Sequence, residues 1–152
     1  MSDSGRLFGV RALVCGGANG IGEAISRTLA RHDARVLAAD HPETDIAGRY
    51  RDVPGVTGLP LGLGSPDSAA TRTAADKLDG LDVVIICTNL QPQKPQDDAA
   101  AYADASKQRL AQLNQFFDAA LPLLQKSPGG RFIVLGQLRS AFAKGAEELF
   151  AR

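Results

Sequence analysis

The segment at residues 15–22, Cys-Gly-Gly-Ala-Asn-Gly-Ile-Gly, constrains the fold of this chain more than any other feature. It follows a short, nearly continuous apolar run at residues 10–15, and apolar side chains at helical spacing begin just after it. Such a run is typical of a strand that is covered on both faces, as in a parallel sheet. A glycine-rich turn from this kind of strand into a helix is where α/β domains bind the phosphates of a nucleotide.

Each position of this glycine loop has a physical role in phosphate binding. We expect Gly16 to permit the sharp turn, Gly20 to clear the approach of a diphosphate, and Gly22 to let the helix pack closely. Free N–H groups at the helix start, including that of Ile21, favour an anion together with the helix dipole. Asn19 tolerates a left-handed backbone and adds a side-chain donor. The alternative is a tight strand-to-helix turn with no ligand.

A carboxylate, Asp40, ends the second predicted strand at residues 35–40. It lies about 20 residues after the loop, where an acidic side chain meets the ribose hydroxyls of adenosine. Hydrogen bonds to a charged group of this kind contribute about 1.5–3 kcal/mol. Asp40 would repel a 2′-phosphate, and Gly17 offers no basic side chain to neutralise one, so we expect NAD in preference to NADP. The alternative is a solvated residue at the end of a strand.

The rest of the chain alternates predicted strands and helices. Further strands are expected at residues 56–61, 83–87 and 132–135, and helices at 20–31, 65–78, 101–126 and 140–152. Strands separated by helices imply right-handed crossovers and a parallel sheet. We therefore expect residues 1–152 to form a single α/β domain with a doubly wound parallel sheet.

Composition excludes several classes of partner. The 17 basic and 17 acidic side chains balance, which gives no broad electrostatic footprint for nucleic acid or an anionic membrane. No run approaches the roughly 20 apolar residues that span a bilayer, and the N-terminus lacks the pattern of a secretory signal. Cys15 and Cys87 lie far apart without metal-ligand spacing, so we interpret them as small buried hydrophobic residues. We expect a cytoplasmic, reduced protein without a metal.

The sequence resembles the short-chain dehydrogenase/reductase family. The loop matches that family's pattern Thr-Gly-x-x-x-Gly-x-Gly, with Cys15 at the threonine position, and the likeness continues through Asp40 and the later strands. The resemblance implies a Rossmann-like sheet of about five strands in the order 3-2-1-4-5, and hydride transfer between a nicotinamide and a carbonyl or alcohol substrate. It covers the N-terminal two-thirds of a usual member, so the sixth and seventh strands are expected to be missing. It also implies cofactor contacts at Leu63 and Asn89.

The family's catalytic set of Asn, Ser, Tyr and Lys is only partly matched. The resemblance gives Asn114 and Lys144 the asparagine and lysine roles, whereas Gln137 and Ser140 stand where serine and tyrosine belong. A positioned acid or base contributes about 10²–10⁴-fold to a rate, and a serine hydroxyl is a far poorer acid than a tyrosine. We therefore expect weak or absent turnover. The alternatives are that Asn114 is a polar residue in an apolar helix face and that Lys144 is a solvated lysine.

Three functions remain open at this point. The chain is an NAD-dependent oxidoreductase, a catalytically inactive dinucleotide-binding module, or an interaction domain in which the glycine loop is only a turn. The expected strand order leaves residues 132–135 as an exposed apolar edge, and such edges favour pairing with another chain. We therefore expect either that the protein forms a homo-oligomer through this edge or that the sequence is a truncated piece of a longer ancestor.

Overall fold

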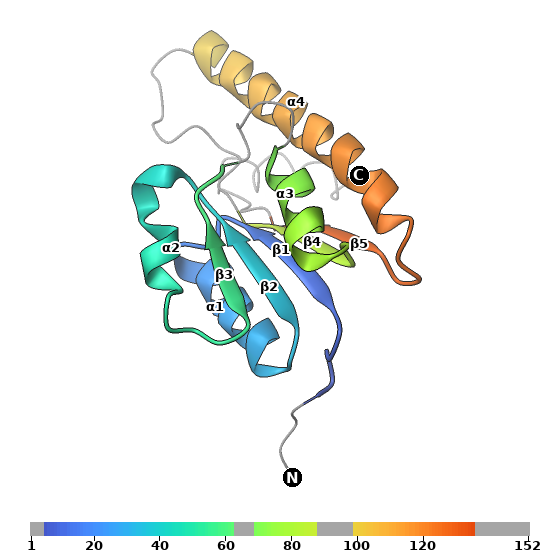
Figure 1. Ribbon diagram of the computed structural model, residues 1–152. Coiled ribbons are helices and arrows are strands. Elements are labelled where there is room, and N and C mark those ends of the chain that lie inside the picture. The colour runs from blue at the N-terminus through green and yellow to red at the C-terminus, as the bar shows by residue number, and fades with distance from the viewer. Residues whose placement is uncertain (1–4, 63–68, 88–98, 136–152) are drawn as a thin grey trace, which may run out of the picture.

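The computed structural model describes residues 5–62, 69–87 and 99–135 (Figure 1), and these residues form a parallel sheet between two layers of helices. The strands are β1 (Arg11–Cys15), β2 (Arg35–Ala39), β3 (Val56–Leu59), β4 (Val83–Ile86) and β5 (Arg131–Val134). They lie in the order β3-β2-β1-β4-β5, and each neighbouring pair is parallel. This arrangement confirms the predicted doubly wound sheet and its strand order.

Helices connect the strands within the described residues. They are α1 (Gly20–Arg31), α2 (Ile46–Arg49), α3 (Ala69–Leu78) and α4 (Ala99–Leu124), with a short 3₁₀ turn η1 (Pro42–Thr44). Helix α4 continues past Pro122, two residues before its end. The turn η1 and the four-residue α2 were not predicted, and β3 is shorter than the predicted strand because it ends before Pro60.

Side chains alternate between the two faces of the sheet, and each face has its own core. On one face Leu13, Leu37 and Val84 pack with residues of α3 and α4, including Phe116. On the other face Val14 and its neighbours pack with α1 and with Ile46 of α2. Because both faces are covered, the central strands are apolar at nearly every position, which is why the run at residues 10–15 is continuous.

Arg11 and Arg35 make hydrogen bonds at the amino ends of β1 and β2, which lie at the opposite end of these strands from the glycine loop. The Nε and Nη2 atoms of Arg11 each donate to the Asp82 carboxylate at 2.9 Å, and the Arg11 amide donates to it at 2.9 Å as well. Arg35 donates to the carbonyl oxygens of Leu78 (3.1 Å) and Lys77 (3.2 Å) at the end of α3. The Arg11 guanidinium holds the pKa of the Asp82 carboxyl well below its usual range.

Strand β5 forms one margin of the sheet in the described part of the chain. It pairs with β4 alone, and its side chains Ile133 and Val134 are 39% and 40% exposed. On the neighbouring helix α4, Leu110 and Phe117 are also exposed, and the Phe117 ring lies 5.0 Å from that of Phe132 on β5. The expected apolar edge is therefore confirmed. Within the described ranges, no helix has both the length and the apolar character that a membrane crossing requires.

Candidate functional site: the glycine loop

The glycine loop lies between β1 and α1, at the carboxyl edge of the sheet (Figure 1). The amides of Gly16 and Gly17 both donate to the carbonyl oxygen of Ala39, at 2.8 and 3.1 Å, so the loop is tied to the end of β2. Gly16 has φ +81°, in the left-handed region where glycine is favoured. The predicted role of Gly16 in the sharp turn off β1 is confirmed.

Gly20 and Gly22 differ in the space that their surroundings leave for a side chain. A Cβ atom on Gly22 would lie 2.0 Å from the carbonyl oxygen of Gly16, so no side chain fits there. The close approach is between α1 and the loop backbone. A Cβ atom on Gly20 would meet nothing within 4 Å, although its φ of +52° strains other residues. The space that the sequence assigns to a diphosphate is thus open on the side of Gly20.

The start of α1 presents amides that the described part of the protein does not use. Asn19 is the N-cap in an extended conformation, with φ −144° and ψ 161°, and its side chain makes no capping bond. Asn19 thus does not use the left-handed backbone that it tolerates, because Gly20 adopts it instead. Glu23 donates the first helical bond to Asn19, and the amides of Ile21 and Gly22 have no acceptor in the described residues. Ile21 is 61% exposed, whereas Gly22 is buried beneath it. This helix start therefore reaches the surface at Ile21, and amides at such a position favour an anion.

Asp40 has a second role that the sequence did not indicate. One carboxylate oxygen accepts a hydrogen bond from the amide of Ala18 at 2.9 Å, and the other accepts one from the amide of His41 at 2.7 Å. The first bond crosses from the end of β2 to the glycine loop and braces it. Each carboxylate oxygen has a second lone pair, so this bracing leaves acceptor capacity for a ligand.

Tyr50 is a loop contact that sequence reasoning missed. Its hydroxyl donates to the carbonyl oxygen of Gly17, and the residue is only 2% exposed. The Arg27 guanidinium lies 5.5 Å from the centre of the ring. Burial raises the pKa of the Tyr50 phenol, so it is a neutral donor at physiological pH. The one available signal was an aromatic residue within the polar segment at residues 48–52.

The two cysteines lie on adjacent strands near the carboxyl edge. The Cys87 amide donates to the Cys15 carbonyl oxygen at 2.8 Å, whereas the side chain of Cys15 belongs to the core beside α3 and α4 and that of Cys87 packs against the opposite core. Both thiols are free, as expected. Burial raises the pKa of both, which agrees with their interpretation as small buried residues.

Of the candidate catalytic residues, Asn114 alone lies in the described part of the chain. Asn114 is exposed on α4. Lys144, Gln137 and Ser140 lie outside the described residues, and so do the cofactor candidates Leu63 and Asn89. Among the residues that are described, no cluster of three histidine, cysteine, aspartate or glutamate side chains could hold a metal ion.

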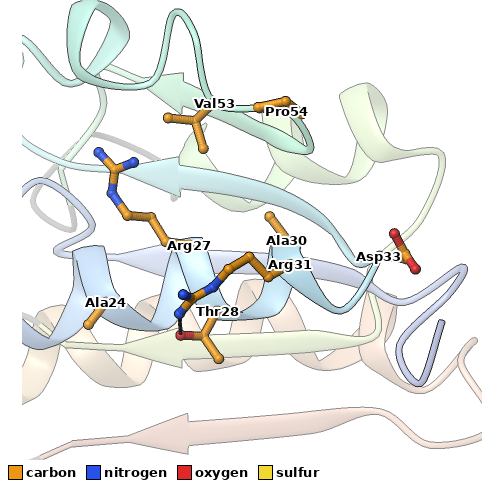
Figure 2. Close-up of a pocket in the computed structure, with 8 residues that line it drawn as sticks. All are labelled: Ala24, Arg27, Thr28, Ala30, Arg31, Asp33, Val53 and Pro54. Carbon is orange, nitrogen blue, oxygen red and sulfur yellow. Dashed lines mark hydrogen bonds between the residues drawn. The ribbon is translucent and has the colours of Figure 1, made fainter. Parts of the chain in front are cut away.

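A separate cavity of about 570 Å³ lies on the outer side of α1 (Figure 2). Arg27, Arg31 and Asp33 line it from α1 and the turn that follows, and Val53 and Pro54 line it from the segment before β3. Arg31 donates to the hydroxyl of Thr28 at 2.9 Å across its floor. No residue of the glycine loop belongs to this cavity, so it is distinct from the proposed anion site.

The sheet order and the loop between β1 and α1 define a Rossmann-like α/β domain of the dinucleotide-binding class. The family model for short chain dehydrogenase matches residues 11–139. The chain therefore belongs to the short chain dehydrogenase family, as its resemblance implied.

Individual proteins agree with this assignment. L-xylulose reductase of Bos taurus is 35% identical over 80 residues, which is 53% of this chain and 32% of that protein. A short chain dehydrogenase of Burkholderia cenocepacia in complex with NADP is 26% identical, with a TM-score of 0.68 over 85% of this chain and 56% of that one. A 7α-hydroxysteroid dehydrogenase complexed with NADH shares the fold at 23% identity, with a TM-score of 0.73 over 89% and 56% of the two chains. The chain thus spans about half the length of these solved structures, and its match covers about a third of the curated relative.

Proposed function

We propose that this chain binds NAD through the glycine loop and that its oxidoreductase activity is weak or absent. The observation that carries this proposal is the start of α1, where the amides of Ile21 and Gly22 have no acceptor among the described residues and the space beside Gly20 is open. Helix amides left free in this way, together with the helix dipole, favour a diphosphate. The described residues of the loop therefore fit the nicotinamide dinucleotide that the family implies.

The contacts of the bound dinucleotide follow from this placement. The amides of Ile21 and Gly22 would donate to the diphosphate, and the Asp40 carboxylate would accept from the ribose hydroxyls of adenosine. Asn19 is free to add a side-chain donor because its side chain caps nothing. Leu63 and Asn89 are proposed contacts on the strength of the family resemblance.

The preference for NAD over NADP rests on the charge of Asp40. A 2′-phosphate would lie close to a carboxylate that two backbone amides already hold in place at 2.9 and 2.7 Å. Because the carboxylate cannot swing away without losing both bonds, it repels the phosphate and favours the free hydroxyl. Gly17, next to this position, supplies no compensating cation.

The reaction assigned by family membership is hydride exchange between a nicotinamide and a small carbonyl or alcohol. The bound nicotinamide would supply or accept the hydride, and the protein must supply or accept a proton at the substrate oxygen. In this sequence Asn114 and Lys144 keep two of the family's four positions, while Gln137 and Ser140 replace the serine and tyrosine. Without the tyrosine phenol as proton donor, the rate falls by about 10²–10⁴-fold.

The second candidate function is a dinucleotide-binding or interaction module without catalysis. It is favoured by the same two replacements, at Gln137 and Ser140. A panel of small aldehydes and ketones with NADH separates the two candidates. Absorbance loss that depends on substrate and disappears in Asn114→Ala supports the oxidoreductase, and no turnover despite tight NADH binding supports the module.

We also propose that the protein is cytoplasmic and that it self-associates through the apolar surface of β5 and α4. Ile133, Val134 and Phe117 are exposed on neighbouring elements, and unpaired strand edges favour association with another chain. Light scattering after size exclusion should give a mass above that of the monomer. Ile133→Lys should shift the mass to 15.9 kDa, and a parent that is already monomeric would refute the interface.

The direct test of the proposed cofactor is calorimetric titration with NADH and NADPH. NADH should bind more tightly than NADPH, and Asp40→Ala should reduce the difference between them. Equal affinities of the parent for the two cofactors would refute the proposed preference. Failure of both to bind would refute the function.

A further inference from the structure

The peptide group between Gly17 and Ala18 is held at both of its ends. Its carbonyl oxygen, on Gly17, accepts the hydrogen bond from the Tyr50 hydroxyl. Its N–H group, on Ala18, donates to the Asp40 carboxylate at 2.9 Å. Because a peptide group is planar and its N–H and C=O point in opposite directions, these two bonds together fix the rotation of the whole plane.

The loop cannot move closer to the sheet, because its backbone already packs against β2. A Cβ atom on Gly17 would lie 2.8 Å from the Cβ of Ala38, so the loop backbone rests directly on β2. The Gly17 amide is also bonded, to Ala39 at 3.1 Å. The remaining freedom of the Gly17–Ala18 segment is rotation of its peptide plane, which is the motion that Tyr50 and Asp40 oppose.

Tyr50 is itself fixed by charged side chains of α1 and α2. The Arg27 guanidinium lies over its ring at 5.5 Å, and such cation–π contacts contribute to placement. Arg27 bonds to Glu23 at 2.9 Å, and Arg49, next to Tyr50, bonds to the same carboxylate at 3.2 Å. The phenol therefore has a defined position from which to donate.

We propose that Tyr50 is a positioning residue for diphosphate binding: together with Asp40 it clamps the Gly17–Ala18 peptide and so directs the loop that leads into the free amides of α1. This inference rests on the proposed function, because it assigns a new residue to the same site. It also links the loop to α2, a segment with no residue in the predicted contact set.

Replacement of Tyr50 by phenylalanine isolates the hydroxyl, because it keeps the ring in the core and beneath Arg27. The Gly17 carbonyl then loses its donor, and the peptide is held at the Asp40 end only. Val56→Ala is the matched control: Val56 is 7% exposed and belongs to the same core cluster as Tyr50. Val56 lies on β3, so this substitution should lower global stability without a specific effect on the loop.

The first readout needs no ligand. Amide hydrogen exchange and amide chemical shifts are measured for residues 16–22 in the parent, Tyr50→Phe and Val56→Ala, with residues 11–15 of β1 as an internal reference. We expect Tyr50→Phe to raise exchange at the loop several-fold more than at β1 and to shift the Ala18 amide. Val56→Ala should change loop and strand alike.

The second readout is NADH affinity well below the melting temperature of each protein. Loss of one hydrogen bond corresponds to roughly a 3- to 10-fold rise in Kd, and we expect this for Tyr50→Phe with an unchanged Kd for Val56→Ala. A Tyr50→Phe protein with parental loop exchange and parental Kd would overturn the inference. If the parent itself binds no NADH, the proposed function fails, and the loop exchange still decides whether Tyr50 positions the loop.

Discussion

The Asp40 carboxylate accepts a hydrogen bond from the Ala18 amide at 2.9 Å, which joins the end of β2 to the loop that follows β1. The residue that is proposed to select the adenosine ribose thus also braces the loop that is proposed to receive the diphosphate. Under the proposed function, recognition of the sugar and placement of the phosphates would be coupled through this one side chain.

Asp40→Asn and Asp40→Ala separate these two contributions. Asn keeps one acceptor oxygen for Ala18 but removes the charge, so NADPH affinity should rise relative to NADH while the loop remains ordered. Asp40→Ala removes both the acceptor oxygen and the charge. Because hydrogen bonds to a charged group contribute about 1.5–3 kcal/mol, NADH should bind to this variant at least about 10-fold more weakly. Calorimetry with both cofactors measures this, and an Asp40→Ala protein with parental NADH affinity would refute the coupling.

Gly22→Ala should be strongly destabilising. Its Cβ would lie 2.0 Å from the Gly16 carbonyl oxygen, a backbone atom that cannot rotate away, and overpacking of this kind costs about 1–3 kcal/mol or more. Gly62→Ala is the control, because its Cβ would meet the nearest atom of His41 at an ordinary 3.7 Å. Urea denaturation compares the two, and similar free energies of unfolding would contradict the close packing.

The Arg11–Asp82 pair should contribute stability that depends on pH. Its hydrogen bonds to Arg11 lower the pKa of Asp82 in the folded state, so the contribution is present above the unfolded pKa of about 3.9 and is lost as pH falls below it. Asp82→Asn should reduce the free energy of unfolding by about 1 kcal/mol at pH 7, and the difference should shrink toward acid pH. Asp76→Asn, at an exposed position of α3, serves as control, and a pH-independent difference would refute this account.

Thiol labelling should distinguish the two cysteines. Cys15 is 1% exposed and Cys87 is partly exposed, while burial raises the pKa of both thiols. We expect slow modification of Cys87 in the native protein and of Cys15 only after unfolding. Mass spectrometry of a time course measures both, with Cys87→Ser as the control. Because Cys87 follows β4 at the carboxyl edge, its labelling should weaken NADH binding, and full labelling without loss of binding would contradict this placement.

The strand pattern could be predicted from sequence because both faces of the sheet are covered. Continuous apolar runs such as residues 83–86 identify buried parallel strands, and the alternation with helices fixes their direction. The strand order came from the family resemblance. Cys15 and Cys87 are free, as expected, because a disulfide between adjacent parallel strands would be strained.

The missed features depend on contacts between distant segments. Helix α2 has four residues, too few for a periodic signal, and it follows Asp45, whose φ of +47° is unusual for a residue with a side chain. The loop contact of Tyr50 spans 33 positions. The sequence could not show which residue of the Asn19–Gly20 pair takes the left-handed backbone, and Gly20 adopts it at lower cost.

Titration of NADH into Gly20→Val tests the central claim most directly, because the substitution fills the open space beside the Ile21 and Gly22 amides, for which the described residues offer no acceptor. Gly9→Val is the matched control, since Gly9 also has positive φ and nothing within 4 Å of a Cβ, so it introduces similar strain away from the loop. The account predicts NADH binding by the parent and by Gly9→Val, and none by folded Gly20→Val. Equal NADH affinity in all three proteins would contradict it.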